Sequence, residues 1–307
     1  MTKKALVMRS TGSWYDVLDE NHQIRKARTR GKLKLQGLKV TNPIAVGDYV
    51  LYEEEGEQNL VIYQILEREN CIVRKATHKS HHAHIIAANI DQCLLIATLA
   101  MPRTSLGFID RFLVSAQSFG IEAVLVFNKS DLLEEQDLEL LEEIMGIYQK
   151  IGYQSVAISA VKDQDLEALN QILEGKKTLI AGHSGVGKST IVNRIAPDLH
   201  QKTAFVSDFS QKGVHTTTFA EMFEIRKDTF FIDTPGIKEL GLMDIDKEEI
   251  AHFFPEMEAV LGECKYYNCT HVQEPACKVL EMVEAGKIAV SRYQSYVSMF
   301  HDEDIFR

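Results

Sequence analysis

The segment "KTLIAGHSGVGKSTIVNRIA" constrains the fold more than any other, because it joins an apolar strand, a glycine loop and a helix. Residues 182–189, the phosphate loop, match G-x-x-x-x-G-K-[ST]. Such a loop turns backbone N–H groups toward phosphate at the positive end of a helix. Lys188 would add charge at the β- and γ-phosphates, and the Ser189 hydroxyl can ligate Mg²⁺. The segment predicts a nucleotide site in an α/β domain without choosing between ATP and GTP. The expected phosphate-binding residues are Gly182, His183, Ser184, Gly185, Val186, Gly187, Lys188, Ser189 and Thr190.

The residues before this loop alternate between strand and helix patterns. Apolar stretches such as "CLLIATLA" and "EAVLVFN" alternate with amphipathic ones such as "GFIDRFLVSAQSF" and "DLELLEEIMGIYQKI". This alternation predicts βαβ units and a mostly parallel sheet with helices on both faces. Ligands of such sheets bind beyond the carboxyl ends of the strands, so the loops that follow strands are candidate binding loops.

The loop after "EAVLVF", residues 128–131, is suited to bind the edge of a guanine and is called the base loop. Asp131 offers only acceptors, which match guanine N1–H and its exocyclic amine but not adenine. Asn128 and Lys129 would flank the base, and the Ala160 N–H in "ISA" could donate to guanine O6. A site built on such hydrogen bonds rejects bases that lack them. The base loop precedes the phosphate loop by about fifty residues, the reverse of ordinary GTP-binding chains. The expected base-binding residues are Asn128, Lys129, Ser130, Asp131, Ser159 and Ala160.

Two short motifs after the phosphate loop predict groups near the γ-phosphate. "DTPG" ends an apolar strand and offers Asp233 for the Mg²⁺ shell and the Gly236 N–H for the phosphate. In "GVHTTTFAEMF", Thr217 is the preferred ligand of Mg²⁺ and γ-phosphate, with Thr216 and Thr218 as alternatives. Either motif alone is more typical of an ordinary turn or strand, so the prediction depends on their combination.

The first 68 residues show short strand patterns separated by turn residues and predict a small barrel, either OB-like or SH3-like. Its aromatic residues could stack on unpaired bases or fill the core. Residues 1–44 hold ten Lys/Arg against three Asp/Glu, whereas the whole chain has a net charge of −10. This asymmetry could steer one face toward a polyanion, or it could be a solvated surface. The aromatic residues concerned are Trp14, Tyr15, Tyr49, Tyr52 and Tyr63.

The chain lacks an apolar run of the ~20 residues that a membrane span needs and has no signal-peptide pattern at its start. We therefore expect a cytoplasmic protein with no membrane association, whose five cysteines are reduced thiols or metal ligands. The histidine-rich segment "HKSHHAH", residues 78–84, could bind a metal, but an exposed polar linker fits better because no Cys or acidic residue accompanies it.

The segment "CKYYNCTHVQEPAC" gathers three cysteines and one histidine in 14 residues. Cys264, Cys269, His271 and Cys277 could form a tetrahedral zinc site in a reducing compartment. The spacing C-x₄-C-x-H-x₅-C departs from common finger patterns, so free thiols remain the alternative. A closed set of four ligands would be structural, fixing a small domain with a marginal core.

The motif order "NKSD", "ISA", "GHSGVGKS", "HTTT", "DTPG" resembles that of circularly permuted GTPases. Together with the barrel pattern and the Cys/His segment, the chain from about Ala5 to at least Val283 resembles the RsgA (YjeQ/YloQ) family. The resemblance implies an OB-fold at residues 1–72, a permuted α/β P-loop GTPase domain at 80–240 and a small, mostly helical zinc domain at 241–307. It also implies a monomeric GTP hydrolase, acting on an acid anhydride, that binds the small ribosomal subunit and its 16S rRNA and assists late maturation. Hydrolysis of GTP to GDP would be stimulated by the subunit, with Zn²⁺ on the Cys₃His set and Mg²⁺ on GTP, the latter at Ser189 and Thr217.

Catalysis requires a group that orients the attacking water. Many GTPases use a Gln directly after the DxxG motif, but this chain has Ile237 there. We therefore expect slow hydrolysis in isolation. His215 is the best internal candidate to orient water, and a surface switch histidine is the alternative. Because Asp233 to Gly236 leads directly into the C-terminal segment, loss of the γ-phosphate could move that segment.

Two other functions fit the same motifs. One is a nucleotide-binding module that signals by occupancy, with negligible hydrolysis. The other is a permuted GTPase of a different assembly pathway, although that alternative leaves the basic barrel and the zinc segment unexplained together. GTP turnover with and without small subunits separates the first from a GTPase, and co-sedimentation with subunits tests the second.

Overall fold

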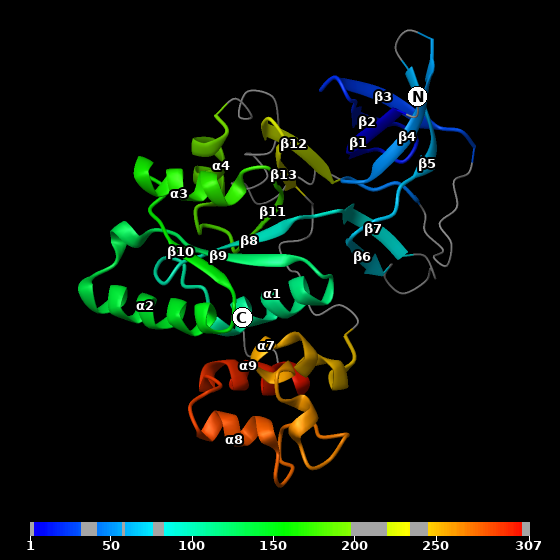
Figure 1. Ribbon diagram of the computed structural model, residues 1–307. Helices are drawn as coiled ribbons and strands as arrows, with labels where there is room; N and C mark the ends of the chain where they lie inside the picture. The colour runs from blue at the N-terminus through cyan, green and yellow to red at the C-terminus, as the bar shows by residue number, and fades with distance from the viewer. Residues whose placement is uncertain are drawn as a thin grey trace. The chain divides into compact units, whose positions relative to one another are not determined.

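The computed structural model describes residues 3–31, 42–56, 59–75, 83–197, 220–233 and 245–302. The chain divides into two compact units, whose helices and strands are drawn in Figure 1. The first unit comprises Met1–Cys93, Asp163–Ala181 and Lys188–Lys238. The second comprises Leu94–Lys162, Gly182–Gly187 and Glu239–Arg307. Among the described residues, no helix has the length and apolar character needed to cross a lipid bilayer.

The first unit begins with a closed barrel of five described strands. β1 pairs antiparallel with β2 and β4, β2 with β3, and β4 with β5, whereas β3 and β5 run parallel and close the barrel. This order is the one expected for the OB-like alternative. The strands are β1 (Lys3–Ser10), β2 (Tyr15–Leu18), β3 (Ile24–Thr29), β4 (Tyr49–Glu55) and β5 (Asn59–Ile65).

The barrel core contains two of the aromatic residues for which stacking on bases was considered. Tyr15 and Tyr52 are 2% and 4% exposed and pack with Val7, Val50 and Leu60. The Tyr15 hydroxyl donates to the Asn42 side chain at 2.9 Å, which satisfies its polar end. For these two tyrosines the core alternative is therefore correct. Trp14, by contrast, is 44% exposed.

A short hairpin follows the barrel. Strands β6 (Cys71–Lys75) and β7 (Ala83–Ala88) pair antiparallel. The buried Asp48 carboxylate accepts two hydrogen bonds from the Arg68 guanidinium, each at 2.6 Å, and Arg68 also donates to the Pro43 carbonyl. These bonds fix the chain between the barrel and the hairpin.

The α/β part of the first unit carries the strand that enters the phosphate loop. β11 (Lys177–Ala181) runs parallel to β13 (Thr229–Asp233), which pairs antiparallel with β12 (Glu221–Arg226). Leu179 lies opposite Ile232, so Asp233 ends its strand where β11 approaches the loop. Helices α3 (Asp163–Leu173) and α4 (Lys188–Ile195) complete this part. Strand β12 also pairs with β1 of the barrel.

The α/β part of the second unit is built on buried strands. β9 (Glu122–Phe127) runs parallel to β10 (Gln154–Ala157) and neighbours β8 (Gln92–Ala97), whose last four residues belong to this unit. The apolar stretches predicted as strands are β8 and β9, and the two amphipathic stretches form α1 (Leu106–Ser118) and α2 (Glu135–Lys150). A 3₁₀ turn, η1 (Ser130–Leu132), follows β9.

The C-terminal part of the second unit is helical, and one residue of α1 belongs to its core. Val114 is fully buried with Ile250, Phe254, Tyr296 and Met299. In Figure 1, α1 lies between β8 and β9 on one side and α7 and α9 on the other. The described C-terminal elements are η4 (Lys247–Phe253), α7 (Pro255–Glu258), η5 (Leu261–Glu263), α8 (Lys278–Glu284) and α9 (Val290–Phe300).

A buried charged network joins the same two regions. Arg292 of α9 is 1% exposed and donates to Asp110 of α1 at 2.8 Å and to Glu256 at 2.7 and 3.1 Å. The Tyr148 hydroxyl also donates to Asp110 at 2.8 Å. Burial raises the pKa of Asp110, and the adjacent Arg292 opposes that shift. Such a network is stable only while every charge keeps its partner.

Candidate nucleotide and metal sites

The phosphate loop connects β11 to α4 through three glycines with positive φ angles. At Gly182 (φ 137°) a Cβ atom would collide with the Ile96 carbonyl oxygen, and at Gly187 (φ 98°) with the Asn128 amide nitrogen. Other residues would therefore distort the loop at both positions. Lys188, the first residue of α4, is buried, and Ser189 follows it in the first turn.

Asn128 of the base loop holds two other loops through one side-chain amide. Its Nδ2 donates to the Val186 carbonyl of the phosphate loop at 2.8 Å, and its Oδ1 accepts from the Ala160 N–H at 3.0 Å. The side chain is 4% exposed. The chain therefore brings the base loop, the "ISA" loop and residues 182–187 together around one buried amide.

The remaining base-loop residues lie nearer the surface. Lys129 has a left-handed backbone (φ 66°), and its Nζ donates to the Met101 carbonyl at 2.6 Å. Ser130 and Asp131 lie in η1, with Asp131 exposed. Ser159 is fully buried. The Ala160 N–H is bonded to Asn128, so its predicted donation to guanine O6 requires a change of partner when a base binds.

The loop after β8, residues 98–105, is a part of this region that the sequence motifs did not indicate. Its backbone is closed by Thr104, whose N–H donates to the Thr98 carbonyl at 2.8 Å and whose hydroxyl accepts from the Thr98 N–H at 3.1 Å. A Cβ on Gly185 would touch the Pro102 ring. The rule that ligand loops follow strands would have indicated this loop, since it directly follows the predicted strand "CLLIATLA".

Asp233 is described at the end of β13, but several predicted residues lie outside the described residues. These are His215, Thr216, Thr217, Thr218, Gly236 and Ile237. Residues 78–82 of the histidine-rich segment also lie outside them. The roles assigned to these residues stay predictions.

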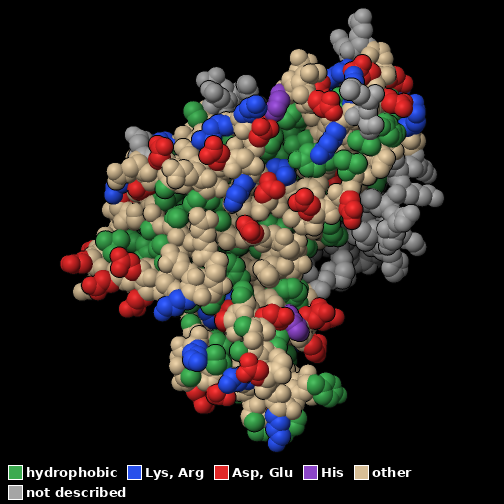
Figure 2. Space-filling model, viewed as in Figure 1, with side chains coloured by type: hydrophobic (Ala, Val, Ile, Leu, Met, Phe, Trp, Pro, Cys, Tyr) green, Lys and Arg blue, Asp and Glu red, His purple; other side chains and the backbone are tan. Residues whose placement is uncertain are grey.

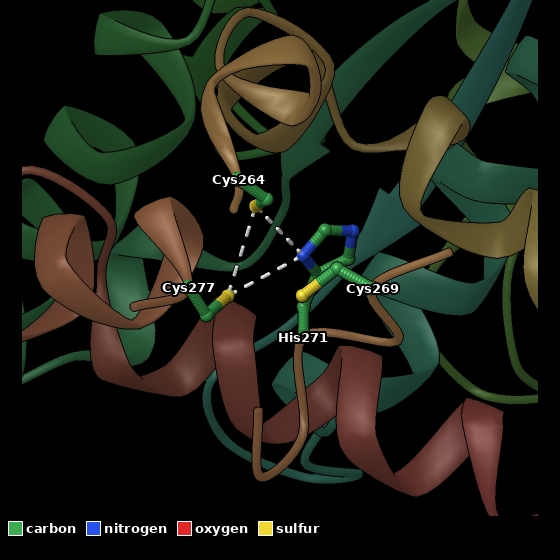
Figure 3. Close-up of side chains that lie close together, drawn as sticks. All are labelled: Cys264, Cys269, His271 and Cys277. Carbon is green, nitrogen blue, oxygen red and sulfur yellow. Dashed lines mark hydrogen bonds between the residues drawn. The ribbon is translucent and has the colours of Figure 1, made fainter. Parts of the chain in front are cut away.

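The four predicted zinc ligands lie together in the second unit (Figure 3). His271 Nδ1 is 3.4 Å from Cys277 Sγ and 3.6 Å from Cys264 Sγ, and the two sulfurs are 4.0 Å apart. The ligand atoms of all four residues, including Cys269, lie within 4.8 Å of one another. A tetrahedron with Zn–S of ~2.3 Å and Zn–N of ~2.0 Å has edges of roughly 3.5–3.8 Å. The donor set and its spacing therefore fit a zinc ion.

The surroundings of the four ligands hold the segment in place. The Lys278 N–H points to Cys264 Sγ at 3.4 Å, and the hydroxyls of Tyr293 and Tyr296 donate to the carbonyls of His271 and Thr270 at 2.9 and 2.6 Å. Burial raises the pKa of the Cys269 thiol to about 12 and lowers that of His271. Binding of a metal at this set would require the cysteine thiols to lose their protons.

Glu274 closes the turn between the histidine and the last cysteine. Its carboxylate accepts from the hydroxyl and N–H of Thr270 and from the N–H groups of Val272 and Gln273. Burial alone would raise the pKa of Glu274, but these hydrogen bonds lower it to about 2. The ionised carboxylate therefore stabilises the loop that carries His271.

Comparison with known proteins gives the same assignment over almost the whole chain. The model of the RsgA N-terminal domain matches residues 4–62, and that of the RsgA GTPase matches residues 65–243. The small ribosomal subunit biogenesis GTPase RsgA of Bacteroides fragilis (strain YCH46) is 45% identical over 301 residues, covering 98% of this chain and 97% of that protein. The protein of the same name from Cytophaga hutchinsonii is 47% identical over 306 residues, covering 99% of this chain and 100% of that protein.

Two solved structures share the fold. The crystal structure of YjeQ from Thermotoga maritima matches with a TM-score of 0.80 at 36% identity and covers 100% of both chains. That of YloQ, described as a circularly permuted GTPase, matches with a TM-score of 0.77 at 26% identity and covers 98% of this chain and 95% of its own. The fold is therefore that of a circularly permuted GTPase with an N-terminal barrel, as predicted. More narrowly, the chain belongs to the RsgA GTPase family, which confirms the resemblance inferred from the motifs.

Proposed function

We propose that the chain binds GTP at the base and phosphate loops and hydrolyses it during late maturation of the small ribosomal subunit. The observation that carries the nucleotide site is the buried Asn128 amide, which joins both loops through hydrogen bonds of 2.8 and 3.0 Å. The Asp131 side chain is exposed in η1, so packing within the protein does not block it from binding a base. Its two acceptors select guanine over adenine.

Each motif residue has a separate task in this proposal. Lys188 and the N–H groups of residues 182–190 bind the phosphates, and Ser189 and Thr217 would ligate Mg²⁺ near Asp233. Bound Mg²⁺ supplies neutralisation of the developing phosphate charge. The Gly236 N–H would contact the γ-phosphate, and His215 would orient the attacking water. Because Ile237 has no hydrogen-bonding group, turnover should be slow until the subunit orders the site.

The test is GTP turnover with and without purified small subunits, repeated with Asp131→Asn and xanthosine triphosphate. An Asn side chain can donate to the C2 oxygen that replaces the guanine amine in xanthine. We expect subunits to increase GTP turnover by the wild type, and the variant to prefer xanthosine triphosphate. Unchanged base preference in the variant would contradict the assignment of Asp131. Turnover that subunits leave unchanged would contradict the ribosomal role and favour another pathway.

We also propose that the Cys₃His cluster holds one structural zinc ion. The support is a donor set in which Cys264, His271 and Cys277 lie 3.4 to 4.0 Å apart and all four ligand atoms lie within 4.8 Å of one another, as zinc coordination requires. Metal analysis of the purified full chain should give about one zinc per molecule, and Cys277→Ser should lose it. Cys93→Ser is the matched control, because Cys93 is a buried cysteine of β8 that does not belong to the Cys₃His cluster. Retention of zinc by Cys277→Ser would contradict the site.

A further inference from the structure

Helix α1 presents a ring to the phosphate loop near its first turn. The Phe108 ring stacks on His183, the second residue of that loop, with ring centroids 3.9 Å apart and an interplanar angle of 32°. The helix start is fixed independently, since the Ser105 side chain accepts from the Phe108 N–H at 3.3 Å. A capped helix start gives Phe108 a defined position against the loop.

The opposite face of α1 packs against the C-terminal helices. Residues two apart on a helix do not share a face, whereas residues four apart do. Asp110 and Val114 therefore share the face that contacts α9, through the Arg292 guanidinium and the apolar core. Helix α1 thus contacts the phosphate loop through Phe108 and α9 through Asp110.

A buried ion pair holds the contact between α1 and α9. Arg292 is 1% exposed and Asp110 fully buried, and the guanidinium also lies 4.5 Å from the centre of the Phe254 ring. Separating the pair would leave the buried Asp110 carboxylate with the Tyr148 hydroxyl but without a cation. A displacement of α9 that keeps this pair intact therefore moves α1 as well, and with it the Phe108 ring.

We propose that Phe108 is a positioning residue for the phosphate loop, and that the Arg292–Asp110 pair extends its support into the C-terminal helices. The proposal rests on the function proposed above, that residues 182–189 bind nucleotide phosphates. A bound phosphate fixes the loop, and the loop fixes His183 against Phe108. Because coupling between two sites is reciprocal, nucleotide binding stabilises α9, and a loosened α9 weakens nucleotide binding.

The experiment combines GDP titration with hydrogen exchange on the full chain. Phe108→Leu keeps an apolar side chain but removes the ring, and we expect GDP affinity to fall about fivefold or more. Phe108→Tyr keeps the ring and should restore affinity to near that of the wild type. Arg292→Met should weaken GDP binding in the same direction. The control is Lys287→Met, which removes an exposed cation of the C-terminal region and should leave affinity unchanged.

Hydrogen exchange separates positioning from general stability. In the wild type, GDP should increase amide protection in both residues 182–187 and α9, and in Phe108→Leu the α9 gain should be lost. If Arg292→Met does not fold, Phe108→Leu still decides, because that residue lies outside the charged network. Unchanged GDP affinity in Phe108→Leu would overturn the proposal. So would a wild-type protein in which GDP increases amide protection at residues 182–187 but not in α9. Absence of GDP protection at residues 182–187 would instead overturn the nucleotide site itself, and the coupling with it.

Discussion

The Asn128 side chain makes two hydrogen bonds from a position that is almost fully buried, and alanine can replace neither. Asn128→Ala would leave the Val186 carbonyl and the Ala160 N–H without this partner. Losing two such bonds costs about 2–3 kcal/mol, so guanine nucleotide affinity should fall at least about tenfold. Titration with a fluorescent GDP analogue measures this, and Asn21→Ala, an exposed barrel residue, is the control. An affinity within twofold of the wild type would show that the loops keep their positions without the amide.

Glu274 gives the C-terminal region a pH dependence of known sign. Its folded-state pKa of about 2 lies below the ordinary 4.5, so the ionised carboxylate stabilises the fold above about pH 4.5. That contribution is lost as the pH falls from 4.5 toward 2. We expect Glu274→Gln to melt at a lower temperature than the wild type at pH 6, with the difference shrinking by pH 3.5. Thermal melts at both pH values test this, with Glu284→Gln, an exposed glutamate of α8, as control. A difference that grows on acidification would contradict the assignment.

At the scale of the element, α1 acts as part of the C-terminal core as well as of the α/β layer. Val114→Ala removes two methyl groups from a fully buried position and should cost about 2 kcal/mol. The expected consequence is faster hydrogen exchange in α9 and a melting temperature lower by about 5 °C. Val161→Ala changes a side chain that is 64% exposed and should leave both unchanged. Equal effects of the two substitutions would show that α1 does not belong to this core.

Elements with strong apolar periodicity could be predicted from the sequence, and weakly patterned ones could not. Strands β8 and β9 are buried apolar runs, and α2 has a clear amphipathic period, so all three were recognised. β3 reads "IRKART", in which only Ala27 is buried and the other side chains are exposed or partly exposed. Its assignment depends on pairing with β2 and β5, which no local pattern reveals. Tertiary pairing, rather than propensity, decides such strands.

The candidate sites divide in the same way. Asn128, the phosphate loop and the Cys/His cluster were predictable because their chemistry fixes residue type and spacing within short segments. Phe108 and Arg292 were not, because a ring beside a loop and a buried ion pair across 182 residues leave no motif. Contacts of this kind depend on which helix faces meet, and that follows only from the folded chain.

At the scale of the whole molecule, the basic excess of the N-terminal residues is partly compensated within the barrel. A guanidinium nitrogen of Arg28 lies 2.6 Å from a carboxylate oxygen of Glu55. The corresponding distance from Arg30 to Glu53 is 2.9 Å. Figure 2 shows acidic and basic side chains intermixed on the visible barrel surface. Exposed pairs of this kind contribute only about 0–1 kcal/mol, so a polyanion could displace the glutamates. These two arginines can therefore bind a polyanion only in competition with the glutamates beside them.

Under the proposed ribosomal role, this competition predicts that removing carboxylates strengthens binding to the small subunit. In the double variant Glu53→Gln and Glu55→Gln, both arginines become available to phosphates. We expect tighter binding to the small subunit and a steeper salt dependence, with a slope larger by about 1–2 in log–log terms. Co-sedimentation at several salt concentrations provides the measurement. The control, Glu139→Gln with Glu142→Gln, makes the same charge change on exposed residues of α2. If both double variants respond equally, net charge rather than the barrel surface explains the effect.

The place of α1 in the C-terminal core also sets an order of events while the chain is being made. Asp110 and Arg292 are 182 residues apart. At about 5–20 residues per second, α1 emerges from a translating ribosome roughly 10–40 s before α9 does. During that interval Asp110 lacks Arg292, and Val114 lacks Tyr296 and Met299, so the face has only the partners that precede α9 in the chain. A truncated chain that lacks α9 keeps the contacts of this face with Tyr148, Ile250 and Phe254 but leaves Asp110 without its cation.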